Sequence, residues 1–401
     1  MKSESLFYLL AKPFIYHLHG AFLVILVFFI GYFLLVFFYK DRLKKIRWLN
    51  LITILLVIIL GLYCRLSLAG FTLGNYDLFS YEIVAKILSE GKNVYLYTHR
   101  YNYSPFWFTI LFSLYKISLI FPKISFFFIV RAFLTLVDLV ILLVLYKISK
   151  LKKIFFPPVA IGFFLNPISI IITGHHGQFE NLSILFILLG VYFYLKNRKS
   201  KLPALLFLFG GIIKHIVFNQ VLVFLNHIFK DKKKVVFSFG LSVLIFLGTF
   251  IPYWSLGRRG IIKNVFQYES LTGGYGISYF LEKINLDLVS VYSKIFILLF
   301  FSFAFIFKTK KLMRAVLINF LFFLTFTSGM SDQYLVLPLA IGALSYSWFF
   351  LGYTLIGSLY LFQSPVQLVL RQYNFVSSNI VWLLCLFWFI REVFQSYEKK
   401  N

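Results

Sequence analysis

Asp77 is the residue of this sequence whose chemistry is simplest to state. It ends the run Gly74-Asn75-Tyr76-Asp77, which follows a long apolar stretch and precedes an aromatic and polar run over residues 95–107. A positioned carboxylate can act as a general base that deprotonates an acceptor hydroxyl, which is worth about two to four orders of magnitude in rate. Aspartate is also a favoured helix N-cap, so Asp77 can instead cap a helix that starts near Leu78. The sequence leaves both interpretations open.

A second group of polar residues is the run Gly174-His175-His176-Gly177-Gln178-Phe179-Glu180-Asn181. Five of its eight side chains are strongly polar, which favours a binding or catalytic role. Helix capping and solvation of an exposed turn is the alternative. Two adjacent histidines point to different faces of a helix, so this spacing does not predict a dinuclear metal site.

The composition identifies the solvent around these residues. Of the 401 residues, 60% are hydrophobic and 13% are charged, and that charged share is about half of what an ordinary soluble protein has. Uninterrupted apolar runs recur along the chain and approach the roughly 20 residues that a membrane-spanning helix needs. Examples are 51–62, 132–145 and 235–253. These features exclude a water-soluble fold and predict an all-α membrane protein.

The net charge of +26 falls in short basic clusters between the apolar runs. Such clusters hold the topology of a membrane protein on the cytoplasmic side, whereas a nucleic-acid-binding protein gathers its basic residues on one face. We therefore expect the chain to contact a lipid bilayer and not nucleic acid. Six clusters are assigned to the cytoplasm: 40–47, 147–153, 196–201, 230–234, 308–314 and the tail Lys399 and Lys400.

Successive cytoplasmic clusters must be separated by an even number of crossings, and this rule predicts about thirteen transmembrane helices in one domain over residues 1–401. The stretch 203–229 is too short for two full spans, so short or broken helices are expected there. The external side keeps a large first loop, 70–123, which is expected to carry interfacial helices, and a second loop, 254–287. The predicted spans are 21–38, 49–69, 124–146, 155–173, 182–195, two within 203–229, 235–253, 288–307 and four within 315–390, with external turns at 329–333 and 363–377.

In this topology Asp77 and the run 174–181 lie on the same external side, and several cations need an explanation. Lys214 and His215 lie well inside the stretch 203–229, where a buried cation requires an anion such as a lipid phosphate, unless the lysine extends to the nearer interface. Arg258 departs from the positive-inside bias, which reflects either phosphate binding or a weakly biased loop. Arg131 and Asp138 share one face of a span, and each is expected to pair with a neighbouring helix.

The order of these features resembles the glycosyltransferase C superfamily of polytopic membrane enzymes, which use lipid-phosphate-linked sugars. Asn75-Tyr76-Asp77 is followed by Glu90-Gly91-Lys92-Asn93-Val94-Tyr95 and Arg100-Tyr101-Asn102-Tyr103-Ser104-Pro105. This succession is similar to the first external loop of the glycosylphosphatidylinositol mannosyltransferases. That family has a second Asp where Asn75 stands, so the Asp-x-Asp pair of a metal site is incomplete here.

Two later runs carry the same resemblance. Gly174 to Asn181 is similar to the Gly-His-Phe-Gln-Tyr-Asn turn of the dolichyl-phosphate-glucose glucosyltransferases. The run Ser331-Asp332-Gln333-Tyr334-Leu335-Val336-Leu337-Pro338 resembles the late His-Glu-Lys or Gln-Tyr turn of the superfamily, with Ser331 where His is expected. The richness in Lys, Ile and Phe indicates an AT-rich genome, which favours a prokaryotic source.

The resemblance implies an inverting hexosyl or mannosyl transfer from a polyprenyl-phosphate-linked sugar to a glycan, lipid or protein acceptor outside the cytoplasm. It implies Asp77 as the catalytic base and neither a metal nor another cofactor. Together with the cations, the matching motifs assign substrate contacts to Asn75, Arg100, Tyr101, Tyr103, His175, His176, Gln178, Glu180, Lys214, His215, Arg258, Asp332 and Gln333.

Two other functions fit a multi-pass protein with internal cations. A lipid-linked oligosaccharide flippase or other transporter predicts a site near the bilayer midplane and often repeated halves, whereas the polar residues here gather at one side and no repeat is visible. An O-antigen polymerase-like enzyme or an acyltransferase would also act from outside, with His175 or Arg258 as a candidate group.

Overall fold

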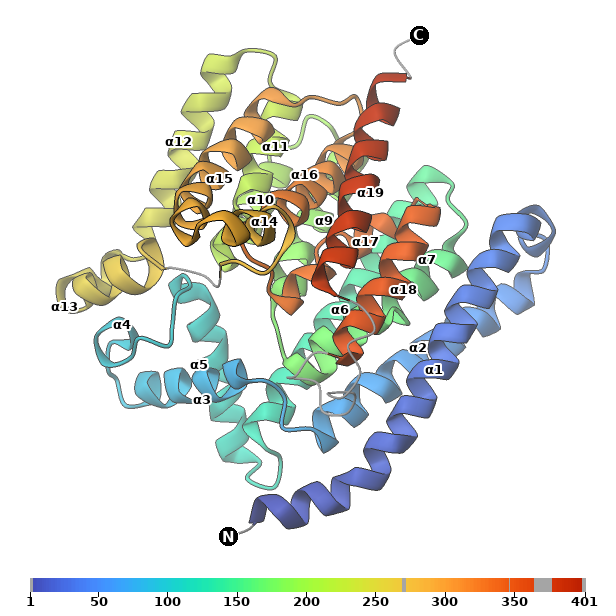
Figure 1. The fold of residues 1–401 in the computed structure, drawn as a ribbon, viewed down its shortest axis with the longest axis horizontal. Coiled ribbons are helices and arrows are strands. Elements are labelled where there is room, and N and C mark those ends of the chain that lie inside the picture. The colour runs from blue at the N-terminus through green and yellow to red at the C-terminus, as the bar shows by residue number, and fades with distance from the viewer. Residues whose placement is uncertain (1–2, 269–271, 346, 364–376, 399–401) are drawn as a thin grey trace.

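The computed structural model describes residues 3–268, 272–345, 347–363 and 377–398, and within these ranges the regular structure is helical, with no strand. In Figure 1 the helices α1 (Ser3–Leu43) and α2 (Arg47–Phe71) run diagonally across the lower right of the view. Helices α9 (Glu180–Lys196), α12 (Lys232–Gly248) and α19 (Ser378–Glu398) belong to the upper part of the view. The all-α fold class predicted from the sequence is confirmed.

Five of the described helices are long and apolar enough to cross a membrane, or seven if each of two bent helix pairs forms one span. The predicted membrane character is therefore supported by both length and composition. Thirteen crossings stay a prediction, because the other apolar helices have only 10–17 residues. At 1.5 Å per residue, a helix of that length covers less than the roughly 30 Å of a hydrocarbon core. The five candidate spans are 22–43, 47–71, 126–152, 287–306 and 378–397.

The stretch 203–229 contains the short and broken helices that its length predicts. Helix α10 (Leu202–Ile213) ends at Lys214, whose backbone is extended, and a 3-10 turn over 215–217 leads into α11 (Asn219–Ile228). Pro203 lies in the first turn of α10, where its missing N–H is not needed. The prediction of short or broken helices is confirmed. The break falls at Lys214, the buried cation for which the sequence analysis expects an anion.

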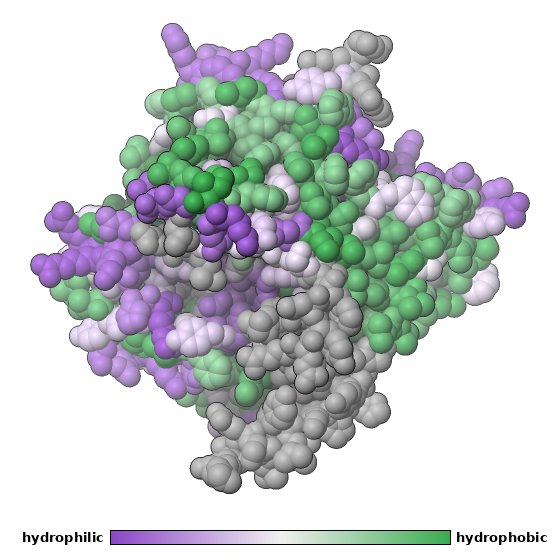
Figure 2. Space-filling model, viewed as in Figure 1, coloured by the Kyte–Doolittle hydropathy of each residue, from purple (hydrophilic) through white to green (hydrophobic). Residues whose placement is uncertain are grey.

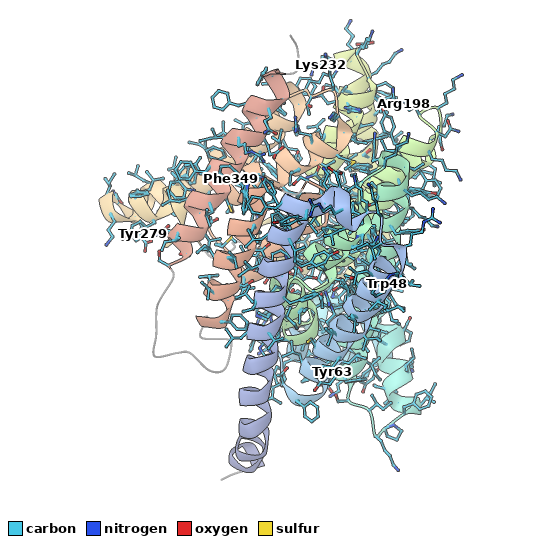
Figure 3. All side chains as sticks on the ribbon, turned by 90° about the vertical axis from the view of Figure 1, so that its right-hand side faces the viewer. Trp48, Tyr63, Arg198, Lys232, Tyr279 and Phe349 are labelled. Atoms are coloured by element: carbon cyan, nitrogen blue, oxygen red, sulfur yellow. The ribbon has the colours of Figure 1, made fainter. Side chains whose placement is uncertain are left out.

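Several basic turns that the sequence assigns to one side of the membrane lie at one end of the molecule. Lys308 Nζ donates to the backbone carbonyl of Phe229 at 2.9 Å, which joins two of these turns. Arg314 donates to Gln395 near the end of α19 at 2.9 Å. Figure 3 shows Arg198 and Lys232 at the top of the view, and Tyr63 toward the opposite end. The tail Lys399 and Lys400 lies outside the described residues.

The first predicted external loop folds into three helices, α3 (Tyr76–Ser89), α4 (Val94–Tyr97) and α5 (Pro105–Ile120). They occupy the lower left of Figure 1, where α4 approaches α13 (Ile251–Ile261). The contact is close: Asn93 Nδ2 donates to the Tyr253 carbonyl at 3.0 Å, and a Cβ at Gly260 would lie 1.7 Å from the Tyr95 carbonyl oxygen. The two predicted external loops are therefore neighbours.

The second predicted external loop begins earlier in the chain than expected. Helix α12 ends at Gly248, and the chain turns by 85° into α13 and a π-helical turn over 262–266, so the expected end of the span at 253 is wrong. A further helix, α14 (Gly276–Ile284), precedes α15 (Leu286–Ile306). Most of the predicted turn 363–377 lies outside the described residues.

The outer surface is largely apolar, as a lipid-facing protein requires. Leu51, Phe237 and Leu298 are examples of large apolar side chains that the fold leaves exposed. Figure 2 shows apolar residues over much of the upper and right-hand faces, while hydrophilic residues gather at the top and on the left.

The remaining helices complete the fold: α6 (Phe126–Lys152), α7 (Phe156–Phe164), α8 (Pro167–Ile171), α16 (Leu312–Phe326), α17 (Leu339–Gly342) and α18 (Trp348–Gln363).

Candidate active site

Asp77 lies in the first turn of α3, and its neighbour Asn75 is the N-cap of that helix. The Asn75 side-chain oxygen accepts a hydrogen bond from the Asp77 backbone N–H at 3.0 Å, which satisfies one of the orphan donors at the helix start. The interpretation of Asp77 as the cap is therefore wrong. Its carboxylate is half-buried and can interact with other groups.

Gln178 is the group that orients this carboxylate. Its side-chain Nε2 donates to Asp77 Oδ2, and its Oε1 accepts from the Tyr81 hydroxyl at 3.2 Å. Tyr81 follows Asp77 by four residues on α3, so both side chains lie on one helix face. Among the residues that the structure describes, the Asp77 side chain accepts hydrogen bonds only through Oδ2. Its Oδ1 is therefore available to a hydroxyl donor.

The run 174–181 is buried at every position, so the interpretation of this run as a solvated turn is wrong. The end of the preceding bent helix pair is a π-helical turn over 172–176, and Gly177 then reverses the chain with a φ of 66°. His175 Nδ1 lies 2.9 Å from the Thr72 hydroxyl just after α2. The turn therefore packs against the start of the chain segment that carries Asp77.

We expect Gly177→Ala to lower the stability of the folded chain by more than Gly91→Ala does. Both glycines have a positive φ, which costs an L-residue about 1–2 kcal/mol. A Cβ at Gly91 meets nothing within 4 Å, whereas at Gly177 it would lie 2.7 Å from Leu78 Cδ2 and 3.2 Å from Arg131 Cγ. Thermal unfolding of the two purified variants in one detergent measures the difference. Equal losses would show that the close packing of this turn contributes nothing.

Glu180 and Lys214 form a buried ion pair beside Asp77. The side chain of Lys214 is 3% exposed and that of Glu180 is 0% exposed, so the interpretation that Lys214 extends to an interface is wrong. The Lys214 ammonium also lies 4.5 Å from the ring centroid of Phe179 and 5.2 Å from that of Tyr103. A buried cation needs such compensation because its desolvation is costly. The break between α10 and α11 positions Lys214 for both contacts.

Tyr81 and Tyr103 share this space, because the Tyr81 hydroxyl donates to Gln178 and the Tyr103 ring centroid lies 5.2 Å from the Lys214 ammonium. Burial raises the pKa of Tyr103 well above its ordinary value, and the charges of Asp77 and Glu180 raise it further. Burial and the charge of Asp77 likewise raise the pKa of Tyr81. Both phenols are therefore protonated donors at neutral pH. We call Asp77, Tyr81, Tyr103, Gln178, Glu180 and Lys214 the Asp77 cluster.

Two tyrosines that the sequence analysis did not select also lie beside the Asp77 cluster. Burial raises the pKa of Tyr334 above its ordinary value, and the charges of Glu180 and Asp77 contribute. The pKa of Tyr268 is raised by burial and by Asp77. The position of Tyr81 could have been predicted, because it follows Asp77 by four residues on one helix. Tyr268 and Tyr334 are distant from Asp77 in the sequence, and only the fold brings them near it.

A second buried network holds the frame of the site. Asp138 of α6 accepts from Arg65 Nε of α2 at 2.9 Å and from the Thr173 hydroxyl at 2.8 Å, and it also accepts from the Asn181 amide. Arg131 donates to the Ala69 and Thr72 carbonyls at 2.7 Å and 2.9 Å, where a cation complements the C-terminal end of α2. The prediction that Arg131 and Asp138 each contact a neighbouring helix is confirmed.

Two other residues of the first loop, Arg100 and Tyr101, are predicted substrate contacts, and they differ in exposure. Arg100 is exposed, and its guanidinium lies 4.6 Å from the ring centroid of Tyr76, the residue before Asp77. Tyr101 is buried, and its hydroxyl donates to the Ser104 carbonyl and accepts from the Phe108 N–H at 3.0 Å. Arg100 therefore faces outward near Asp77, whereas the Tyr101 hydroxyl is used within its own loop.

The later predicted residues surround the buried turn or lie at the surface. The exposed His215 has its ring 6.1 Å from that of Tyr103. Asp332 accepts from the Tyr360 hydroxyl at 3.0 Å and Gln333 accepts from Ser331 at 2.8 Å, in a 3-10 turn that contacts α9. Arg258 is exposed on α13, with its guanidinium 5.9 Å from the Trp254 ring centroid.

His176 differs from its neighbour, because both of its ring nitrogens are buried without a hydrogen-bond partner among the described residues. The two histidine ring centroids are 5.5 Å apart.

No group of three or more His, Cys, Asp or Glu side chains that could hold a metal occurs in the described ranges. No protein-family model matches the chain, and no curated protein matches it.

Proposed function

We propose that the protein is a membrane glycosyltransferase that moves a hexose from a polyprenyl-phosphate-linked donor to the hydroxyl of an acceptor outside the cytoplasm. The observation that supports this proposal is the half-buried carboxylate of Asp77, which Gln178 holds through one oxygen while the other remains available. A general base needs this combination of fixed orientation and access to a substrate proton.

In the proposed reaction the acceptor hydroxyl attacks the anomeric carbon of the sugar. The bond from that carbon to the phosphate oxygen breaks, the bond to the acceptor oxygen forms, and the hydroxyl proton passes to Asp77 Oδ1. The bonding pair leaves with the phosphate, so the lipid product is polyprenyl phosphate. Direct displacement inverts the anomeric configuration, as the resemblance to the superfamily implies.

Stabilising the leaving phosphate requires a cation, and Arg100 is the candidate with the most suitable position. It is exposed and stacks on Tyr76, next to Asp77 in the chain. Lys214, in contrast, is already neutralised by Glu180, and it could reach a phosphate only if that pair opened. We therefore assign Lys214 and Glu180 to the wall of the site, and Arg100 to the phosphate.

The substitution Arg100→Gln is expected to raise KM for the donor by about 10- to 100-fold, because a hydrogen bond to a charged group contributes about 1.5–3 kcal/mol. The measurement uses membranes that contain the protein and a radiolabelled polyprenyl-phosphate hexose. Arg198→Gln is the matched control, since Arg198 is also exposed and stacks on a tyrosine, Tyr194. Arg198 lies at the top of Figure 3, whereas α3, which carries Asp77, lies in the lower part of Figure 1, and the two views share their vertical axis. The proposed function is rejected if membranes with the parent chain transfer no more label than membranes without it.

The proposal also requires the Asp77 cluster to lie on the extracytoplasmic side of a cell membrane. Cys64 and Cys385 are both buried, so the parent chain gives little background with a membrane-impermeant maleimide. We expect Glu90→Cys to be labelled in intact cells and Arg198→Cys only after the cells are permeabilised. Both positions are exposed. The opposite labelling would contradict an extracytoplasmic site.

A further inference from the structure

An apolar groove of about 360 Å³ lies between α11, α12 and α15, away from the Asp77 cluster. Its walls include Leu222, Phe239, Phe301 and Phe305, and Gly240 contributes to the lining without a side chain. A Cβ at Gly240 would meet nothing within 4 Å, so the gap is open space rather than a tight helix contact. Grooves of this size accommodate segments of small ligands or lipid chains.

A cation lies at one end of this groove. Lys232 Nζ is 4.2 Å from the ring centroid of Phe305, which lines the groove, and it donates to Asn226 Oδ1 at 2.9 Å and to the Phe305 carbonyl. An ammonium has three N–H donors, so one donor remains after these two bonds. Lys308, three residues beyond Phe305, donates to the Phe229 carbonyl at the same end. The apolar groove therefore ends at two lysines.

We propose that this groove binds an acidic phospholipid, with one acyl chain in the groove and its phosphate at Lys232 and Lys308. Charge complementarity supports this occupant, because two neighbouring cations at a membrane surface attract an anionic headgroup. The lining is apolar except for Ser302, so it matches a hydrocarbon chain better than a polar ligand. The site is distinct from the one proposed for sugar transfer.

The position along α11 separates this lipid from the sugar donor. The helix starts at Asn219, just after the break that carries Lys214, and ends at Ile228, just before the basic turn 230–234. Leu222 lies one turn into the helix, and Lys232 lies beyond its other end. A phosphate at Lys232 is therefore separated from the Asp77 cluster by the length of α11.

The test measures lipid binding by native mass spectrometry of the purified full chain in detergent, with dioleoyl phosphatidylglycerol or dioleoyl phosphatidylcholine added. We expect one phosphatidylglycerol to bind at least about fivefold more tightly than phosphatidylcholine, since one lysine near an anionic lipid contributes about that factor. Gly240→Leu should abolish this binding by filling the groove. Gly31→Leu is the control, because Gly31 also faces open space on an apolar helix.

Lys232→Gln tests the headgroup contact separately, since it should weaken the preference for phosphatidylglycerol by about fivefold while phosphatidylcholine binding stays unchanged. Equal binding of the two lipids to the parent chain would overturn the proposal. So would equal lipid binding by the Gly240→Leu and Gly31→Leu variants, with unchanged unfolding temperatures confirming that both are folded. Displacement of phosphatidylglycerol by a lower concentration of polyprenyl phosphate would assign the groove to the sugar donor and would also overturn it.

Discussion

Replacement of Asp77 by Asn is expected to lower the rate of sugar transfer by about two to four orders of magnitude, with little change in donor KM. The amide keeps the shape of the side chain but cannot accept the hydroxyl proton, and general base catalysis contributes about that factor. Gln178 and Asn75 still support the position of residue 77, because their contacts depend on size and hydrogen bonding. The measurement is single-turnover transfer of radiolabelled hexose at saturating donor.

Glu82→Gln provides the matched control for this prediction. Glu82 lies five residues after Asp77 on the same helix, and its carboxylate pairs with Lys86 at 2.9 Å. Because a surface pair of this kind contributes about 0–1 kcal/mol, we expect transfer within about twofold of the parent rate. Equal activity of the Asp77→Asn variant and the parent chain would exclude Asp77 as the base.

The second large effect concerns stability rather than chemistry. We expect Asp138→Leu to destabilise the folded chain by about 3–5 kcal/mol, because it leaves the buried charge of Arg65 without its partner. The Thr173 and Asn181 donors lose their acceptor as well. Thermal unfolding in detergent, followed by the loss of monodisperse protein, measures the effect.

Two further variants separate charge from general damage. The double variant Arg65→Met with Asp138→Leu should recover most of the loss, since replacing both members of a buried pair by apolar residues is often nearly neutral. Asp41→Asn, which breaks an exposed pair with Lys44, should change stability by at most about 1 kcal/mol. If the double variant is no more stable than Asp138→Leu alone, the uncompensated charge is not the cause.

The sequence predicts the parts of this fold that composition and loop charge control. Apolar runs predict the long helices, and basic clusters on both sides of 203–229 predict a broken helix there, as found at Lys214. Helix ends are less predictable, because an apolar run can continue through a break in a helix. The 85° bend falls between Gly248, the last residue of α12, and Pro252 in the first turn of α13, and the apolar run extends past both. The number of crossings rests on assigning every basic cluster to one side, and helix lengths alone support five to seven.

The candidate site was predictable in its residue types and not in its pairings. Asp77 and the run 174–181 are polar residues in an apolar chain. Placing such residues in or beside a membrane costs free energy, so their presence indicates a functional site. Nothing in the spacing indicates that Lys214 pairs with Glu180, since this contact joins segments 34 residues apart across two helices. The sequence gives no signal for the role of Arg65, a single cation within an apolar run, because its partner Asp138 lies on another helix. The alternative that Asp77 caps the helix is wrong because the helix begins at Tyr76, two residues before the start near Leu78 that this alternative assumes.

The most direct test of the proposed function is to measure the lipid product formed by the purified chain from a polyprenyl-phosphate hexose. Mass spectrometry would quantify polyprenyl phosphate and glycosylated acceptor in the same reaction, with acceptor lipids extracted from the host membrane. We predict one polyprenyl phosphate for each sugar transferred by the parent chain, and at least about 100-fold slower formation of both products by the Asp77→Asn variant. The same chain reconstituted in lipid vesicles provides the contrary outcome: movement of intact donor from one leaflet to the other, without either product, would contradict the proposed transferase and indicate transport.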